Sequence, residues 1–215
     1  MLPTVNVDGL AFIEDNYLKK GVLLEKRTNM HIGSDKCEKT VAGVDLNRNY
    51  GYKFGTGDST SKECGGDNYR GPSAFSEPET QAMKKFLTAH KDEIKFVYNF
   101  HCAGKQFIIP FNGEMPNTLA QRFPEINSIF MEIVNEAKFA EGTDIGPSTE
   151  NIGIVAAGDA GDWILNELSI PAAEAEIGSW DSYGKNWFPH TTSTALSIVK
   201  ENIDWLEYTF EKLGT

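Results

Sequence analysis

Apolar residues along the chain fall into two kinds of pattern. Short runs rich in apolar and β-branched residues, bounded by turn residues, predict buried strands at residues 43–46, 96–100, 107–110 and 171–177. Longer segments, in which apolar residues recur every three or four positions, predict amphipathic helices at residues 76–90, 123–138, 161–168 and 193–213. The first of these helices opens with Ser76, early acids and a first-turn Pro78, which is typical of a capped helix start.

Strands that alternate with helices indicate an α/β fold. The 215 residues contain no internal repeat and no linker-like tract, so we expect a single domain over residues 1–215. Residues 51–71 are rich in Gly, Asp, Ser and Lys, and a segment of this length exceeds an ordinary connection. We therefore expect a functional surface loop there, with Cys64 as a candidate anchor.

The charge balance narrows the choice of partners. Twenty Lys and Arg residues against 31 Asp and Glu residues give a formal net charge of −11. This balance argues against nucleic acid and anionic membranes, and it suits a neutral or cationic substrate. No apolar stretch approaches the roughly 18 residues of a membrane span, and no secretory signal is visible at the start of the chain.

The segment Gly-Val-Asp-Leu-Asn-Arg-Asn-Tyr at residues 43–50 contains the first candidate binding residues. Its predicted strand places Asn47 and Arg48 at a carboxyl end, where ligands of open α/β sheets bind. The planar guanidinium of Arg48 matches a carboxylate with two parallel hydrogen bonds, and the Asn47 amide can add another. The pair could hold a terminal carboxylate; a solvated turn is the alternative.

Two further predicted strands carry titratable side chains. The run Phe-Val-Tyr-Asn-Phe-His at residues 96–101 places His101 beside small residues, with room for a metal or substrate. A histidine that is only hydrogen-bonded is the alternative. Glu174 and Glu176 point to the same face of their strand, and an apolar setting would raise their pKa toward that of a general base. A solvated acidic edge strand is the alternative there.

In chain order, these segments resemble the zinc metallocarboxypeptidases of the carboxypeptidase A/B type. The resemblance rests on residues 6–9 (Asn-Val-Asp-Gly), 43–50, 69–80 (Tyr-Arg-Gly-Pro-Ser-Ala-Phe-Ser-Glu-Pro-Glu-Thr), His101, Asp162, Trp163 and Glu176. It covers the whole chain and implies a peptidase that uses one zinc ion to hydrolyse the C-terminal peptide bond of peptides and proteins. It also implies a partial catalytic domain with a mixed, mainly parallel sheet and helices on both faces, lacking the family's N-terminal strands.

The resemblance implies a role for individual residues. His101 takes the position of the third zinc ligand, and Asn47 and Arg48 take the positions that grip the substrate's terminal carboxylate. Glu176 takes the general base position, where it would remove a proton from zinc-bound water and pass it to the leaving amine. Arg27 takes the position of the arginine that stabilises the oxyanion, with Lys26 as the alternative if the alignment slips by one.

Two zinc ligands of the family form a His-x-x-Glu pair upstream of the Asn-Val-Asp-Gly element, and this chain does not contain them. A catalytic zinc site needs three protein ligands, so we expect the chain by itself to be inactive. His90 and Glu93 spell His-x-x-Glu, but they lie at a predicted helix C-terminus among lysines, where a histidine is favourable without a metal. His31 and His190 are expected to be surface or packing residues.

Other positions also depart from the family. Cys102 and Ala103 replace a serine and an aromatic residue after the zinc histidine, and Ile154 falls near the position of a mobile tyrosine. Residues 157–162 are expected to surround the pocket for the terminal side chain of the substrate. Asp159 could favour a basic side chain there, whereas Gly161 gives no charge signal, so the preferred residue stays open.

Cys37 and Cys64 flank the Asn-Arg segment, much like a disulfide of secreted family members. Such a disulfide would indicate secretion or a lysosomal or vacuolar location, and two unpaired thiols are the alternative. Without the family's N-terminal strands, one flank of the sheet would be exposed. We therefore expect a partner chain or a missing N-terminal segment to cover it.

Three functions are compatible with these observations. The first is the C-terminal two-thirds or so of a zinc carboxypeptidase, favoured because base, ligand and carboxylate clamp occur together in the correct order. The second is a non-catalytic protein that binds peptide C-terminal carboxylates through Asn47 and Arg48. The third is a structural subunit that docks on a partner through the exposed flank of its sheet.

Overall fold

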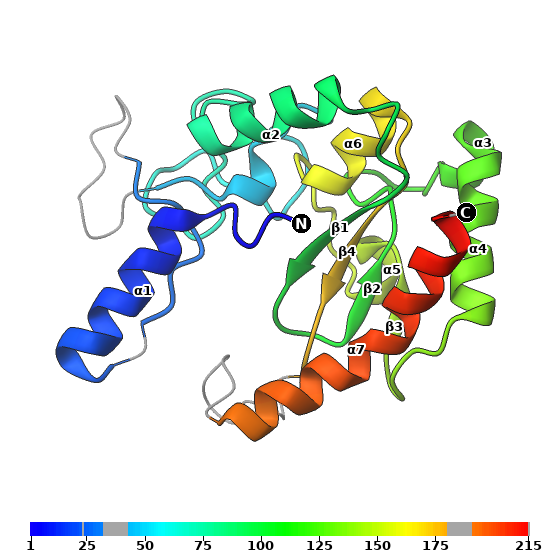
Figure 1. The fold of residues 1–215 in the computed structure, drawn as a ribbon. Coiled ribbons are helices and arrows are strands. Elements are labelled where there is room, and N and C mark those ends of the chain that lie inside the picture. The colour runs from blue at the N-terminus through cyan, green and yellow to red at the C-terminus, as the bar shows by residue number, and fades with distance from the viewer. Residues whose placement is uncertain (23, 32–42, 180–190, 215) are drawn as a thin grey trace.

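A mixed four-stranded sheet forms the centre of the molecule. The computed structural model describes residues 1–22, 24–31, 43–179 and 191–214 (Figure 1). The strand order is β1-β4-β2-β3, where β1 is Val97–His101, β2 is Gln106–Ile108, β3 is Asp144–Gly146 and β4 is Ala172–Glu176. The pairs β1–β4 and β2–β3 are parallel, and β2–β4 is antiparallel. The predicted fold class, an α/β fold with a mainly parallel sheet, is confirmed.

Helices lie on both sides of this sheet. They are α1 (Val7–Lys20), α2 (Pro78–Ala89), α3 (Leu119–Arg122), α4 (Pro124–Glu136), α5 (Ser148–Asn151), α6 (Ala160–Leu168) and α7 (Thr192–Leu213). In Figure 1, α2 and α6 lie together on one side of the sheet, α4 and α7 lie on the other, and α1 stands apart. Within the described ranges, no helix combines the length and the apolar character needed to cross a membrane.

Strand β4 divides the core into two apolar clusters. Ala173 and Ala175 belong to one cluster, together with Phe130 and Ile133 of α4 and Trp205 of α7. Ala172 belongs to the other, which includes Leu87 of α2 and Trp163 and Ile164 of α6. Because side chains alternate along a strand, Glu174 and Glu176 point to the same side as Ala172, toward the region of α6.

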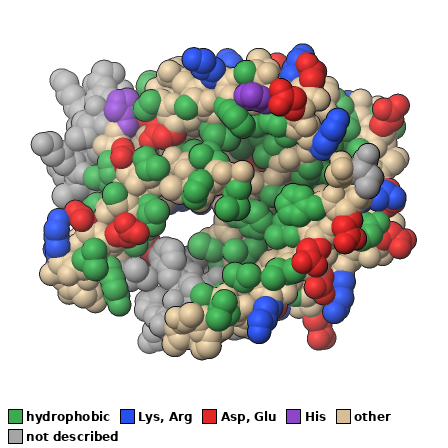
Figure 2. Space-filling model, viewed as in Figure 1, with side chains coloured by type: hydrophobic (Ala, Val, Ile, Leu, Met, Phe, Trp, Pro, Cys, Tyr) green, Lys and Arg blue, Asp and Glu red, His purple; other side chains and the backbone are tan. Residues whose placement is uncertain are grey.

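The sheet has an open edge at β1 in the described part of the chain. Strand β1 is the first of the four in spatial order, and Phe100 on it is 47% exposed. Figure 2 shows hydrophobic side chains gathered over the centre of the same view, with charged side chains mainly around the margin. The expected exposed flank is consistent with this arrangement, and the nature of any covering segment stays a prediction.

The four predicted helices are present as α2, α4, α6 and α7, with ends shifted by one to a few residues. The sequence pattern predicts Ser76 as the N-cap of α2, and this prediction is wrong. The N-cap is Glu77, and the Ser76 hydroxyl donates to Glu77 Oε1 at 2.6 Å. The proline at the first helical position, Pro78, is where the pattern places it.

The predicted strand at residues 43–46 is wrong. Leu46–Arg48 forms a single 3₁₀ turn, η1, with Asp45 as its N-cap. The Asp45 carboxylate accepts the backbone N–H of Asn47 at 3.0 Å, and this local bond competes with a strand ladder. Asn47 and Arg48 therefore lie on a capped turn beside the sheet and not at the end of one of its strands.

The buried position of Ile133 in α4 generates a stability prediction. Ile133 is fully buried, so Ile133→Ala leaves a cavity and should lower the free energy of unfolding by about 2–5 kcal/mol. Ile203→Ala is the matched control, because Ile203 on α7 is 36% exposed and should cost much less. Urea denaturation followed by circular dichroism measures both, and equal losses would contradict this account of the core.

Candidate active site

Four of the predicted site residues meet at one end of the sheet. His101 and Glu176 are the last residues of β1 and β4, and they are partners in the parallel register. Asn47 of η1 reaches the same place: its Nδ2 lies 3.4 Å from His101 Nε2 and donates to Glu174 Oε1 at 3.0 Å. Its Oδ1 accepts the N–H of Ala160, at the start of α6, at 3.0 Å. One amide thus connects η1, β1, β4 and α6.

Arg48, the fourth of these residues, is held by backbone carbonyls. Its Nε donates to the carbonyl oxygen of Ser59 at 2.9 Å, and its Nη1 donates to that of Asn47 at 2.6 Å. Gly158, whose φ is +78°, packs against the backbone of Arg48. A Cβ at residue 158 would lie 2.7 Å from the Arg48 carbonyl oxygen. Among the described residues, Arg48 Nη2 has no acceptor, so one nitrogen of a fixed guanidinium is left for a ligand.

Glu176 has the electrostatic setting of a base. Burial raises the pKa of Glu176 above its ordinary value, and the charge of Glu174 raises it further, whereas His101, Arg27 and Arg48 act to lower it. In the part of the chain that the structure describes, no donor bonds the Glu176 carboxylate. Burial and a neighbouring like charge both favour proton uptake, so this carboxylate is suited to accept a proton during a reaction.

Arg27 lies near this group but is engaged with Asp45. Its Nε is 2.8 Å from Asp45 Oδ2, and the Asp45 side chain is only 3% exposed. Burial acts to lower the pKa of Arg27, but the charge and hydrogen bond of Asp45, together with the charges of Glu176 and Glu174, raise it above its ordinary value. Lys26, the alternative, donates to Thr28 Oγ1 at 2.5 Å. The charge of Arg27 acts on both Glu176 and Glu174, which is compatible with a role at the site.

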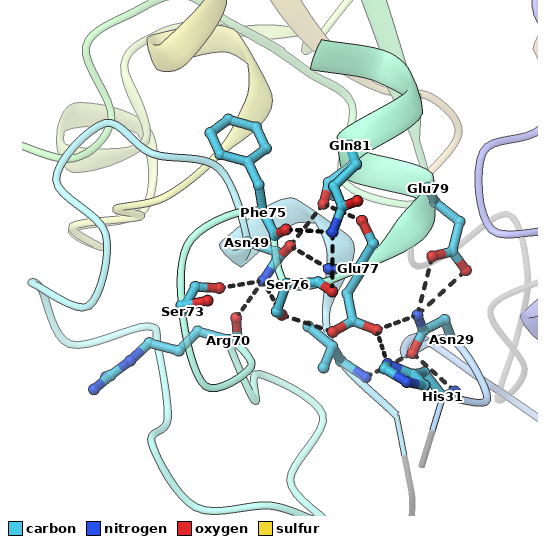
Figure 3. Close-up of polar contacts among 12 residues, drawn as sticks. Asn29, His31, Asn49, Arg70, Ser73, Phe75, Ser76, Glu77, Glu79 and Gln81 are labelled. Carbon is cyan, nitrogen blue, oxygen red and sulfur yellow. Dashed lines mark hydrogen bonds and ion pairs between the residues drawn. The ribbon is translucent and has the colours of Figure 1, made fainter. Parts of the chain in front are cut away.

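A buried amide, Asn49, anchors η1 (Figure 3). Asn49 has no exposed surface, and its Nδ2 donates to three oxygens at 2.8–3.1 Å: Arg70 O, Ser73 O and Ser76 Oγ. Its Oδ1 accepts the Thr80 hydroxyl at 2.7 Å and the Glu77 N–H at 3.4 Å. Gly71 makes room for the amide, because a Cβ there would lie 2.9 Å from Asn49 Nδ2.

Glu77 extends this network toward the segment after α1. Its carboxylate is 1% exposed, accepts from Asn29 Nδ2 at 2.8 Å and lies 2.7 Å from His31 Nδ1 (Figure 3). His31 keeps 46% of its side chain exposed, in agreement with the surface or packing role predicted for it. Together, Asn49 and Glu77 connect η1, the 69–80 block and residues 29–31.

The described residues alone do not fit a zinc ion. They contain no group of three or more His, Cys, Asp and Glu side chains that could hold a metal, and His101 Nε2 faces an amide nitrogen. His90 is the C-cap of α2, and its Nδ1 lies 3.4 Å from Oε1 of the exposed Glu93. His190 and Cys37 lie outside the described residues, so the Cys37–Cys64 pairing stays a prediction.

Two other positions that depart from the family pattern are exposed, and two acids near the candidate site are buried. Cys102, directly after His101, is an exposed free cysteine, and Ile154 is 39% exposed. Asp159 and Asp162 are fully buried at the start of α6. Burial raises the pKa of Asp162 to about 7, although the backbone amides of Asn112 and Gly113 act to lower it.

Comparison with known proteins agrees with this geometry. The model of the zinc carboxypeptidase family matches residues 1–203. The chain belongs to the zinc carboxypeptidase family. Relatives include mast cell carboxypeptidase A of Homo sapiens, 32% identical over 111 residues that cover 52% of this chain and 24% of the relative. A metallocarboxypeptidase A-like protein of Trichophyton verrucosum is 31% identical over 191 residues, 86% of this chain and 42% of the relative.

Solved carboxypeptidase structures share the fold. Bovine thrombin-activatable fibrinolysis inhibitor, in complex with tick carboxypeptidase inhibitor, superposes with a TM-score of 0.73 and 22% identity, covering 98% of this chain and 67% of that chain. Carboxypeptidase A from Helicoverpa armigera gives 0.69 and 21%, covering 99% and 49%. This chain spans less than half the length of the curated zinc carboxypeptidases it matches.

Sequence reasoning missed two residues that organise the site. Asp45 bonds both Arg27 and the backbone of Asn47, and Asn99 of β1 donates to Glu174 Oε1 at 3.5 Å. An aspartate two residues before Asn47 is the pattern of a side-chain-capped turn, and that signal could have identified Asp45. No local pattern points to Asn99, because its partners are distant in sequence.

The burial of Asn49 generates a prediction for the site. Asn49→Ala leaves several buried donors and acceptors without partners, so it should lower the free energy of unfolding by about 3 kcal/mol or more. Asn135→Ala, at an exposed position of α4, makes the same chemical change where no side-chain bond exists among the described residues. Urea titration compares the two, and a small effect of Asn49→Ala would show that η1 does not depend on this network.

Proposed function

We propose that this chain contains the substrate-binding and proton-transfer residues of a zinc-dependent metallocarboxypeptidase. Such an enzyme hydrolyses the C-terminal peptide bond of peptides and proteins. The observation that carries the proposal is the meeting of Asn47, His101 and Glu176 at the carboxyl ends of β1 and β4. Membership in the zinc carboxypeptidase family supports it.

Each residue has a task in this proposal. Arg48 binds the substrate's terminal carboxylate through its remaining nitrogen, and the Asn47 amide lies beside it. Glu176 takes a proton from the attacking water and delivers it to the leaving amine as the peptide C–N bond breaks. Arg27 stabilises the negative oxygen of the tetrahedral intermediate, which requires it to exchange part of its bonding with Asp45.

His101 is proposed as one metal ligand, and the remaining ligands lie outside the described residues. We therefore expect the 215-residue chain to retain well under one zinc ion after dialysis, because one imidazole does not make a catalytic site. Metal analysis of the dialysed protein measures this. His101→Ala should remove any residual binding, and His90→Ala should leave it unchanged. A stoichiometric ion that survives His101→Ala would contradict the assignment.

The carboxylate clamp can be tested without catalysis. A peptide with a free C-terminus should bind the chain more tightly than the same peptide with a C-terminal amide, by about tenfold or more, because the amide removes a charge-assisted bond. Isothermal titration calorimetry measures both affinities. Arg48→Lys keeps the charge but not the planar fork and should weaken binding of the free acid. Equal affinity for acid and amide would refute the clamp.

The second candidate is a non-catalytic protein that binds peptide carboxylates. The absence of a metal-ligand group among the described residues favours it. Mass spectrometry of the incubated peptide separates the two, because an enzyme shortens the peptide by one residue and a binding protein leaves it intact. A secreted, lysosomal or vacuolar location is part of the first proposal and depends on the untested disulfide.

A further inference from the structure

Helix α7 has more apolar surface than the core of the molecule covers. Its buried residues, Ile198, Trp205 and Thr209, form the face that packs on the core. Outside this face, four large apolar residues are 36–67% exposed: Leu196, Val199, Ile203 and Phe210. A surface helix ordinarily has one apolar stripe, directed at the core, and polar residues elsewhere. A second row of exposed apolar side chains therefore indicates a contact with another molecule.

The spacing of this second row is that of paired helices. With the partly buried Leu206 and Leu213, its members follow one another at intervals of three, four, three, four and three residues. This is the heptad spacing found at the seam between two helices that pack side by side. We call the row the α7 stripe, which consists of Leu196, Val199, Ile203, Leu206, Phe210 and Leu213.

We propose that α7 pairs in antiparallel orientation with α7 of a second copy of this chain, so that two α7 stripes form the interface of a symmetric dimer. In this pairing Val199 lies opposite Phe210 of the second copy, and Ile203 lies opposite Leu206. Every stripe residue then has an apolar partner. A two-fold contact uses the same patch on both molecules, so the assembly closes at two copies.

Charged residues beside the stripe favour a second copy as the partner. Lys200 and Glu207 each follow a stripe residue, are exposed and have no ion pair among the described residues. The antiparallel pairing places Lys200 of each copy opposite Glu207 of the other, so two ion pairs form across the interface. On the other side of the stripe the pairing brings together Asn202 and Thr209, which carry no charge.

Other arrangements of the two helices lose these ion pairs. A parallel pairing would bring Glu207 to Asn202 and Lys200 to Ala195, without an opposite charge at either place. An antiparallel pairing shifted by one heptad would bring the two Lys200 side chains together and would match fewer stripe residues. Two copies with a net charge of −11 each repel one another, so a contact that adds opposite charges is the one that can form.

The length of the stripe sets the strength of the association. The stripe extends over residues 196–213, which is about 27 Å of helix at roughly 1.5 Å per residue. A single helix pair of this length lies at the lower end of specific interfaces, whose usual buried area is about 1,200–2,000 Å². We therefore expect a weak, reversible dimer whose population depends on protein concentration.

Sedimentation velocity of the 215-residue chain between about 1 and 200 µM should show an equilibrium between monomer and dimer. Lys200→Glu and Glu207→Lys each place like charges opposite one another twice, so each should weaken the dimer by about tenfold or more. Lys85→Glu, at an exposed position of α2, makes the same charge change as Lys200→Glu away from the stripe and should leave the dimer unchanged. Val199→Asp should abolish the dimer, because it places a charge within the stripe.

A mixture of the Lys200→Glu and Glu207→Lys proteins provides the sharpest result. Each variant alone should be mainly monomeric, whereas the mixture should form a dimer with one copy of each, since both contacts then join Glu to Lys. Circular dichroism of each variant checks that the fold is retained. A chain that stays monomeric at all concentrations, a dimer that neither charge variant weakens, or a mixture that does not associate would overturn the inference. A monomer would assign the α7 stripe to a different occupant, such as a segment outside these 215 residues.

Discussion

The candidate site depends on a turn that no strand supports. Residues 43–48 pass beside the sheet without joining it. Backbone bonds to Asn29 and Tyr69 hold Val44 and Asp45, and η1 depends in addition on hydrogen bonds from side chains. Asn49 provides them from the interior, with five bonds to segments that precede and begin α2. Asp45 provides them from the other side of η1. Both side chains are buried, so their hydrogen bonds are strengthened by the low local dielectric. Losing a partner would leave a buried polar group unsatisfied at a cost in folding free energy, and this favours one conformation of the turn.

The candidate site holds several buried charged side chains. Glu174 and Glu176 of β4 lie near Asp159 and Asp162 at the start of α6. The charge of Arg48 acts on Asp159 and Glu176, and Arg27 interacts with Glu174 and Glu176. Backbone amides and asparagine side chains satisfy some carboxylate oxygens and leave others unused. Burying a carboxylate oxygen without a donor costs free energy, and a ligand that donated a hydrogen bond to it would recover part of that cost.

The sequence predicted the parts of the fold that depend on periodic apolar residues. Helices α2, α4, α6 and α7 and strands β1, β2 and β4 carry clear patterns and were identified. The prediction failed at residues 43–46, because a run such as Gly-Val-Asp-Leu resembles a strand until the Asp45 cap is considered. The sequence analysis predicts no helix at α1, and the structure shows that several apolar residues of this helix are exposed, among them Leu10 and Leu18. The partners of Asn99 and Glu174 could not be predicted, since they come from tertiary contacts.

Alternate residues of strand β4 face two different environments. Ala173 and Ala175 face the cluster formed with α4 and α7, while Glu174 and Glu176 face the opposite side, where the site lies. Substitutions at the first set of positions therefore act on the packing of α4 and α7, and substitutions at the second set act on the charge of the candidate site. A change at residue 174 or 176 alters the acidic face of β4 and leaves in place the alanines that contact α4 and α7, so one strand can vary on one face while it stays constant on the other.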